Sequence, residues 1–205
     1  MRLFFGIGTG RCGTQSLYHL IKKQPNVKVF SELGAGGFEM VPWIPDMNKF
    51  NKTYEYLKNQ PGEIVGEVAI YYLNYLDEIF KRHEDTRVIC LKRDREQTAR
   101  SFDRKTPNRN LWTRPDSKHF KVLPKQERWA PAYPKYDAPK LEALRLYWDE
   151  YYRRVEIYLK KYPNRLRMWS TEAFNEKEGQ LQMLEFIGIP HSRAITEVGI
   201  RRNRT

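Results

Sequence analysis

Five short apolar runs, separated by segments with helical spacing, constrain the fold of this chain more than any other feature. Short apolar strands that alternate with helices build a parallel sheet covered on both faces. The sequence therefore predicts an α/β fold of three layers, with a central parallel sheet flanked by helices. The predicted strands are Leu3–Ile7, Val27–Phe30, Ile64–Ala69, Arg87–Leu91 and Leu166–Trp169.

The clearest predicted helix covers residues 140–161. Pro139 suits its first turn and Pro163 ends it. Between them, apolar residues recur every three or four positions and form one aromatic-rich stripe, for which packing is the expected role. The other predicted helices are Gln15–Lys23, Lys49–Asn59, Leu73–Arg82 and Glu96–Lys105.

Length and composition predict one globular domain over residues 1–205. A disordered chain would not carry 5 Trp, 13 Tyr and 10 Phe. No apolar stretch approaches the roughly 18 residues of a membrane span. The apolar run after Met1 is short, so no signal peptide is expected.

A net charge of +12 and a pI near 9.7 indicate an anionic partner. Nucleic acid, a nucleotide cofactor and an acidic glycan would all suit this charge. No long Lys/Arg block precedes the terminal residues 201–204, so most basic residues are expected on solvated surface. Cys12 lies in a glycine-rich turn and Cys90 in an apolar run, which favours a cytoplasmic location over a disulfide framework.

The segment "GTGRCGTQS", residues 8–16, links the first strand to a helix. Its glycines allow tight turns, and the helix that follows directs free N–H groups at an anion. Arg11 adds a permanent charge. The P-loop of NTPases has Lys where this chain has Thr14, and a hydroxyl for Mg²⁺ where it has Gln15. The segment therefore predicts a phosphate or sulfate site without a metal.

A second segment, "VICLKRDREQTARSF" at residues 88–102, is a predicted strand followed by a helix. It brings Arg93 to the carboxyl end of the strand, and Ser101 follows eight residues later. Ligands of open parallel sheets bind outside the carboxyl ends of the strands. Arg93 is therefore expected on the same edge as the first loop.

Together the two segments resemble the PAPS-dependent sulfotransferase family, with the carbohydrate and bacterial types most similar. PAPS is 3′-phosphoadenosine 5′-phosphosulfate, and PAP is its desulfated product. The first loop is similar to the family's 5′-phosphosulfate loop, and the second segment to its 3′-phosphate element. The stretch "MWSTEAFNEKEGQLQMLEFIGIP" resembles the family's later strand and closing helix.

The resemblance implies a transferase that moves a sulfuryl group from PAPS to a hydroxyl on a sugar or small metabolite, without Mg²⁺. It implies that Arg11 stabilises the charge on the leaving oxygen. The implied cofactor-binding residues are Arg11, Cys12, Gly13, Thr14, Gln15, Ser16, Arg93 and Ser101.

Three residues depart from the family pattern. Cys12 replaces a usual Ser, Gln15 replaces a hydroxyl residue, and Arg95 stands where Pro is frequent. The family's terminal 3′-phosphate loop is matched only loosely by residues 199–202.

The acceptor must lose a proton, so a general base is expected. Glu32 follows the second strand, where related enzymes often place a catalytic Glu, and is the predicted base. Glu67 lies where relatives carry a substrate-facing Glu, and Glu39 is a remoter option. His119 is the histidine expected nearest a substrate. The His and Cys spacing predicts no metal site.

Two other functions remain open from the sequence. An ATP-dependent P-loop kinase or NTPase would share the fold but needs the missing Lys and metal-ligand hydroxyl. A basic nucleic-acid-binding protein without catalysis would explain the charge, but no recognised binding motif is present and neither nucleic acid nor membrane is an expected partner. The acceptor is expected to be set by residues 31–47 and 107–139, the loop segments. The oligomeric state stays open.

Overall fold

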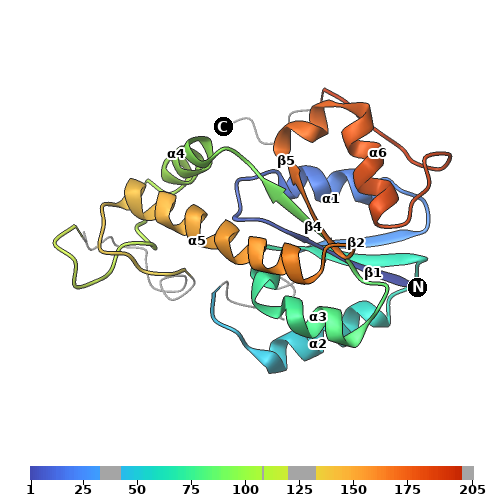
Figure 1. Cartoon of the computed structure of the whole chain (residues 1–205), viewed down its shortest axis with the longest axis horizontal. Helices are drawn as coiled ribbons and strands as arrows, with labels where there is room; N and C mark the ends of the chain where they lie inside the picture. Colours follow the sequence, from blue (N-terminus) through green and yellow to red (C-terminus); the bar gives the residue numbers. More distant parts are fainter. Residues whose placement is uncertain (33–42, 108, 120–132, 200–205) are drawn as a thin grey trace.

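The computed structural model describes residues 1–32, 43–107, 109–119 and 133–199. Within these ranges, five parallel strands form one sheet in the order β2-β3-β1-β4-β5 (Figure 1). This confirms the predicted α/β class and central parallel sheet. The strands are β1 (Arg2–Ile7), β2 (Val27–Ser31), β3 (Ile64–Val68), β4 (Arg87–Lys92) and β5 (Leu166–Ser170).

Helices cover both faces of the sheet and complete the three layers. Figure 1 shows α1 and α6 on one side of the sheet and α2 and α3 on the other. Phe4 of β1 packs with α1 and α6, whereas its neighbour Phe5 packs with α2, α3 and α5, because successive strand residues face opposite ways. In the described part of the chain, no helix combines the length and apolarity that crossing a membrane requires. The helices are α1 (Thr14–Lys22), α2 (Met47–Lys58), η2 (Ile70–Tyr75), α3 (Leu76–Arg82), α4 (Arg95–Lys105), α5 (Lys140–Lys161), η4 (Thr171–Asn175) and α6 (Lys177–Phe186).

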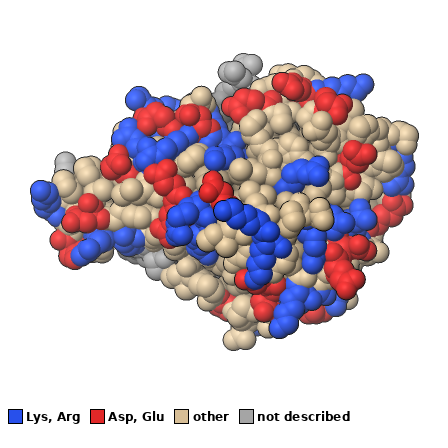
Figure 2. Space-filling view, in the orientation of Figure 1, with Lys and Arg blue, Asp and Glu red and all other residues tan. Residues whose placement is uncertain are grey.

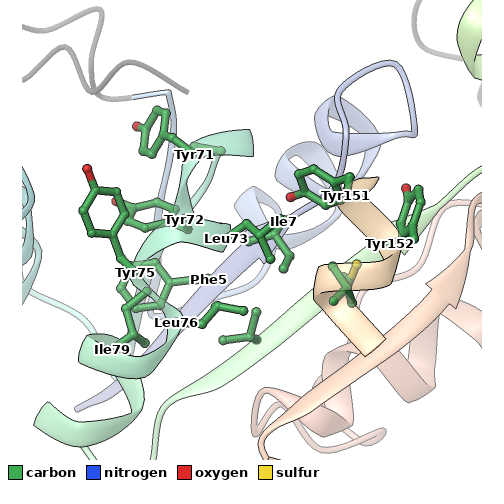
Figure 3. Packing of buried hydrophobic residues seen from close by; sticks show 14 of the residues in the cluster. Phe5, Ile7, Tyr71, Tyr72, Leu73, Tyr75, Leu76, Ile79, Tyr151 and Tyr152 are labelled. Carbon is green, nitrogen blue, oxygen red and sulfur yellow. The ribbon is translucent and has the colours of Figure 1, made fainter. Parts of the chain in front are cut away.

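Tyrosines fill much of the layer beneath α5. Figure 3 shows Tyr71, Tyr72 and Tyr75 of η2 on one side of this cluster, and Tyr151 and Tyr152 of α5 on the other. Each of the five is at most 4% exposed. A buried phenol needs a hydrogen-bond partner. These rings therefore form polar contacts inside the fold as well as packing it.

The predicted bounds agree closely with the structure except after β3. Each strand differs from its prediction by one residue at one end, and the helix predicted for residues 140–161 is α5. The helix predicted for Leu73–Arg82 is wrong at its start, because a 3₁₀ turn, η2, precedes α3. In η2 the hydroxyls of Tyr71 and Tyr72 reach back to Glu67 of β3, which holds this segment in a tight turn.

Strand β1 lies between β3 and β4. Since all strands are parallel, the residues that follow β1, β3 and β4 emerge at one edge of the sheet. This carboxyl edge is where open parallel sheets bind ligands.

Candidate functional site

The loop between β1 and α1 has several residues in the left-handed conformation. Gly10, Arg11 and Gly13 have φ values of 83°, 56° and 97°, in the region that favours glycine. Gly13 is the N-cap of α1, and among the described residues no side chain caps this helix or places a negative charge in its first turn. The first N–H groups of α1 are therefore donors suited to an anion.

A hydrogen-bonded cluster joins this loop to the start of α4. The Nε of Arg11 donates to the Oγ of Ser101 at 3.1 Å. The Nη1 of Arg93 donates to the carbonyl oxygen of Arg11 at 3.2 Å. The structure thus brings Arg11, Arg93 and Ser101 together at the carboxyl edge of the sheet.

Local contacts at the start of α4 position Arg93 and Ser101. The side chain of Asp94 accepts the N–H of Gln97 at 2.8 Å and caps the helix. Arg93 donates from Nε and Nη2 to the Oε1 of Gln97 at 3.3 and 3.2 Å. Ser101 lies on the buried side of α4, 6% exposed. The eight-residue spacing between Arg93 and Ser101 therefore spans a cap and about two helical turns.

Positive charge converges on the loop. Burial lowers the pKa of Arg11, and the nearby guanidinium groups of Arg93 and Arg104 lower it further. Within the described ranges, no carboxylate forms an ion pair with Arg11 or Arg93. An anion bound here would relieve the repulsion between these cations.

Most other basic residues near α4 are already paired. Figure 2 shows Lys and Arg interleaved with Asp and Glu over α4 and the first turns of α5. Arg95 pairs with Asp149 at 2.6 Å, and Glu96 pairs with both Arg100 at 2.7 Å and Arg145 at 2.8 Å. These three arginines therefore have carboxylate partners, unlike Arg11 and Arg93 within the described part of the chain.

Cys12 is buried inside the loop. Its side chain is 0% exposed, and burial raises the pKa of its thiol, so the thiol stays protonated at neutral pH. A Cβ placed at Gly8 would lie 2.4 Å from the sulfur, so the loop backbone wraps closely around it. Cys12 thus fills the loop from within, and the groups left for a ligand there are backbone N–H groups.

Gln15 links the first turn of α1 to the end of β2. Its Nε2 donates to the Oγ of Ser31 at 2.9 Å, which uses one of its two amide hydrogens. Thr14 and Ser16 are partly exposed beside it. Glu32 follows Ser31 directly, so the Gln15–Ser31 bond places the predicted base close to the start of α1 and to residues 8–13, the predicted anion loop.

Glu32 has an unusual backbone and an altered acidity. Its φ is 50°, and its N–H donates to the carbonyl oxygen of Val68 at 3.3 Å. The residue is exposed, yet the protein crowds its carboxyl group enough that desolvation raises its pKa. The pKa of Tyr133 is also raised, by burial and then by the charge of Glu32. A raised pKa suits a carboxylate that accepts a proton.

The other base candidates have different surroundings, although Glu67 of β3 pairs in register with Phe30, two residues before Glu32. Glu67 is 0% exposed, and its two carboxylate oxygens accept hydrogen bonds from Tyr71 and Tyr72. His119 is partly exposed, and its backbone N–H donates to the Oγ of Ser117 at 3.1 Å. Glu39 and residues 200–202 lie outside the described residues.

A shallow hollow of about 480 Å³ opens beside Arg93, at the ends of β4 and β5. The sequence analysis missed it, because its two tryptophans come from α5 and β5 and only the fold brings them together. The sequence did predict β5, and a parallel β5 must also end at the carboxyl edge, which could have indicated that residues after it line the site. Its lining residues are Lys92, Arg93, Asp94, Arg95, Trp148, Met168, Trp169, Ser170 and Glu172.

Thr171 is a second residue that the sequence analysis missed. It follows β5, and its Oγ1 lies 2.8 Å from the carbonyl oxygen of Cys12 and 3.3 Å from that of Lys92. Its hydroxyl therefore ties the anion loop to the end of β4.

Comparisons with solved structures show the fold. The chain aligns with the crystal structure of a sulfotransferase from Alicyclobacillus acidocaldarius at a TM-score of 0.62 and 17% identity, covering 98% of this chain and 85% of that one. It also aligns with mouse sulfotransferase SULT7A1, in a structure complexed with PAP, at a TM-score of 0.51 and 18% identity. That alignment covers 92% of this chain and 58% of the mouse chain. The protein therefore has a sulfotransferase-family fold, in agreement with the resemblance in sequence.

The likeness in sequence is confined to short motifs, whereas the likeness in three dimensions covers most of the chain. No protein-family model matches the chain, and no curated protein matches it by sequence. The residues at the carboxyl edge, rather than overall identity, must therefore carry the argument about function.

Proposed function

We propose that this protein is a sulfotransferase that transfers a sulfuryl group from PAPS to a hydroxyl acceptor, a sugar or a small metabolite. The observation that carries the proposal is the cluster of Arg11, Arg93 and Ser101 at the N-terminus of α1. It combines cations without carboxylate partners among the described residues, a hydroxyl and free N–H groups, which is the donor set that a nucleotide with two separate anionic groups requires.

The residues present fit PAPS in two places. The N–H groups at the start of α1, with Arg11, would hold the 5′-phosphosulfate. Arg93 and Ser101 would hold the 3′-phosphate. The hollow beside Arg93 adds the rings of Trp148 and Trp169, and aromatic faces suit a purine base. The complex of mouse SULT7A1 with PAP supports this assignment by analogy of fold.

PAPS, when bound, supplies the activated sulfuryl group, and the chain supplies charge and a proton acceptor. Arg11 and the loop N–H groups would stabilise the negative charge that develops on the leaving phosphate oxygen. Glu32, with its raised pKa, would take the proton of the acceptor hydroxyl. Cys12, a buried thiol, would shape the loop without reacting.

A cytoplasmic location belongs to the same proposal. Both cysteines, Cys12 and Cys90, are free and buried. Free thiols are typical of a reducing compartment.

Ligand-induced stabilisation tests the proposal against a kinase or NTPase. A ligand that binds only the native state raises the melting temperature. PAP should do so in the presence of EDTA, whereas ATP with Mg²⁺ should do much less because it lacks the 3′-phosphate. Equal shifts from both nucleotides, abolished by EDTA, would favour the NTPase instead. A larger, steeply salt-dependent shift from DNA or RNA would favour the nucleic-acid-binding alternative.

A further inference from the structure

Tyrosine hydroxyls and a tryptophan N–H on helix α5 form hydrogen bonds with the backbone of two segments, the loop after β1 and the end of β4. Tyr147 and Tyr151 contact the loop after β1, and Trp148 and Tyr152 contact the end of β4. The members of each pair are four residues apart, so they lie on one face of the helix, one turn from each other.

The first pair holds the loop. The hydroxyl of Tyr151 accepts the N–H of Gly8 at 3.0 Å and lies 3.4 Å from the carbonyl oxygen of Ile70 in η2. The hydroxyl of Tyr147 donates to the carbonyl oxygen of Thr9 at 2.9 Å. Both tyrosines are at most 1% exposed, as is Thr9. Without these hydroxyls the buried backbone groups would lose their partners, and the loop would have to rearrange.

The second pair holds the end of β4. The Nε1 of Trp148 donates to the carbonyl oxygen of Arg93 at 3.0 Å, and the hydroxyl of Tyr152 donates to that of Leu91 at 2.7 Å. A carbonyl that accepts a bond from α5 points toward α5. The carbonyl oxygens of Thr9 and Arg93 therefore point away from a bound anion. The groups that face the anion are then hydrogen-bond donors.

Helix α5 is itself fixed at the site end. Arg145 binds Glu96 of α4 from Nε and Nη2 at 2.8 and 2.9 Å, and Arg95 binds Asp149 from Nε and Nη2 at 2.8 and 2.6 Å. Because one anchored helix holds both the loop and the strand end, it sets their separation.

We propose that Tyr147, Trp148, Tyr151 and Tyr152 are positioning residues that hold the anion loop and Arg93 at the separation of the two phosphate groups of the nucleotide. Tyr147, Tyr151 and Tyr152 act through the backbone and touch no ligand, whereas Trp148 also lines the hollow beside Arg93. The choice of PAP as a probe rests on the proposed function, whereas the support of the loop rests on the hydrogen bonds alone.

Each Tyr→Phe variant removes one hydroxyl and keeps the ring, whereas Trp148→Phe also replaces the indole with a smaller ring, so Tyr152→Phe is the cleaner test of the second pair. Variants Tyr147→Phe and Tyr151→Phe should weaken PAP binding about five- to tenfold, the loss expected for one hydrogen bond. They should leave binding of adenosine 3′-phosphate, which lacks the 5′-phosphate, within about twofold of wild type. Trp148→Phe and Tyr152→Phe should weaken both ligands, because they support Arg93. Titration calorimetry measures both affinities.

The matched control is Tyr162→Phe at the far end of α5. Its hydroxyl donates to Asp77 at 2.8 Å, so the variant also loses one hydrogen bond. Its affinity for both nucleotides should equal that of wild type. Equal affinity for PAP in the control and in the Tyr147 and Tyr151 variants would overturn the proposal, whatever the melting temperatures.

Amide hydrogen exchange without ligand separates this inference from the proposed function. Tyr151→Phe should speed exchange in residues 8–13 at least about fivefold, whereas Tyr162→Phe should not. If wild type binds neither nucleotide, the proposed function fails, and exchange in the loop still decides whether α5 positions it. Unchanged exchange in Tyr147→Phe and Tyr151→Phe would reject the positioning role.

Discussion

The Nε of Arg11 and the Oγ of Ser101 lie 3.1 Å apart, although 90 residues separate them in the chain. One belongs to the loop after β1 and the other to the buried side of α4. With the bond from Arg93 to the carbonyl oxygen of Arg11, their contact joins two segments that lie far apart in the sequence. A ligand held by one of them is therefore in reach of the other.

Arg93→Ala should weaken PAP binding strongly. A charge-assisted contact is worth about 1.5–3 kcal/mol, which corresponds to roughly ten- to hundredfold in the dissociation constant. The control is Arg100→Ala, which removes a paired, exposed arginine from the helix that follows Arg93 and should have little effect. A smaller loss is predicted for Arg201→Ala, outside the described residues. Equal losses for Arg93→Ala and either comparison variant would contradict this ranking.

Glu32→Gln should lower turnover by about 10²–10⁴-fold, the usual contribution of a general base, and leave PAP affinity nearly unchanged. The amide keeps the shape of the side chain and removes its basicity. The measurement is the initial rate of sulfation, once a panel of sugars and phenols has supplied an acceptor. Near-normal turnover in Glu32→Gln, with loss in Glu67→Gln or His119→Ala, would assign the base to the other residue.

The raised pKa of Glu32 also predicts a pH dependence of stability. Burial makes the folded state bind a proton more tightly than the unfolded state does. This contribution is complete below the ordinary pKa of about 4.3 and is lost as the pH rises through the raised value. Glu32→Gln should therefore raise the melting temperature slightly at pH 7 and not at pH 4. The effect is small because the residue is exposed, and a larger gain at pH 4 would contradict the sign.

Glu67 is buried and accepts hydrogen bonds from two tyrosines, so replacing it should lower the stability of the fold. Glu67→Ala would leave the hydroxyls of Tyr71 and Tyr72 without their acceptor. Each abandoned buried donor costs about 1–3 kcal/mol, so urea denaturation should show a loss of about 2–6 kcal/mol in the free energy of unfolding. The milder Glu67→Gln tests a role toward the acceptor. If Glu67 orients the acceptor, this variant should chiefly raise the acceptor KM.

The sequence predicted the sheet and the two polar segments at its edge, because both leave local patterns. A strand is a short apolar run, and the Arg93–Ser101 spacing is a helix cap plus two turns. The same reasoning assigned α5 a packing role only. The bond from Tyr151 to Gly8 spans 143 residues, and no local pattern reports which backbone group a buried hydroxyl meets.

The tryptophans of the hollow were missed for the same reason, since Trp148 and Trp169 meet only when α5 lies against β5. The start of η2 was missed because the contacts of Glu67 override the helical spacing of the residues that follow it. What the sequence could not predict is therefore tertiary contact rather than secondary structure.

The crowded guanidinium groups around Arg11 have a consequence for the free protein. Repulsion from Arg93 and Arg104, added to burial, makes this loop an electrostatically frustrated part of the fold. Selection for stability alone would replace one of these arginines. A neutral residue at position 11, as in Arg11→Met, would remove the repulsion and should make the fold more stable. Their joint presence marks a trade-off between stability and function, in which the native state tolerates strain that an incoming anion removes.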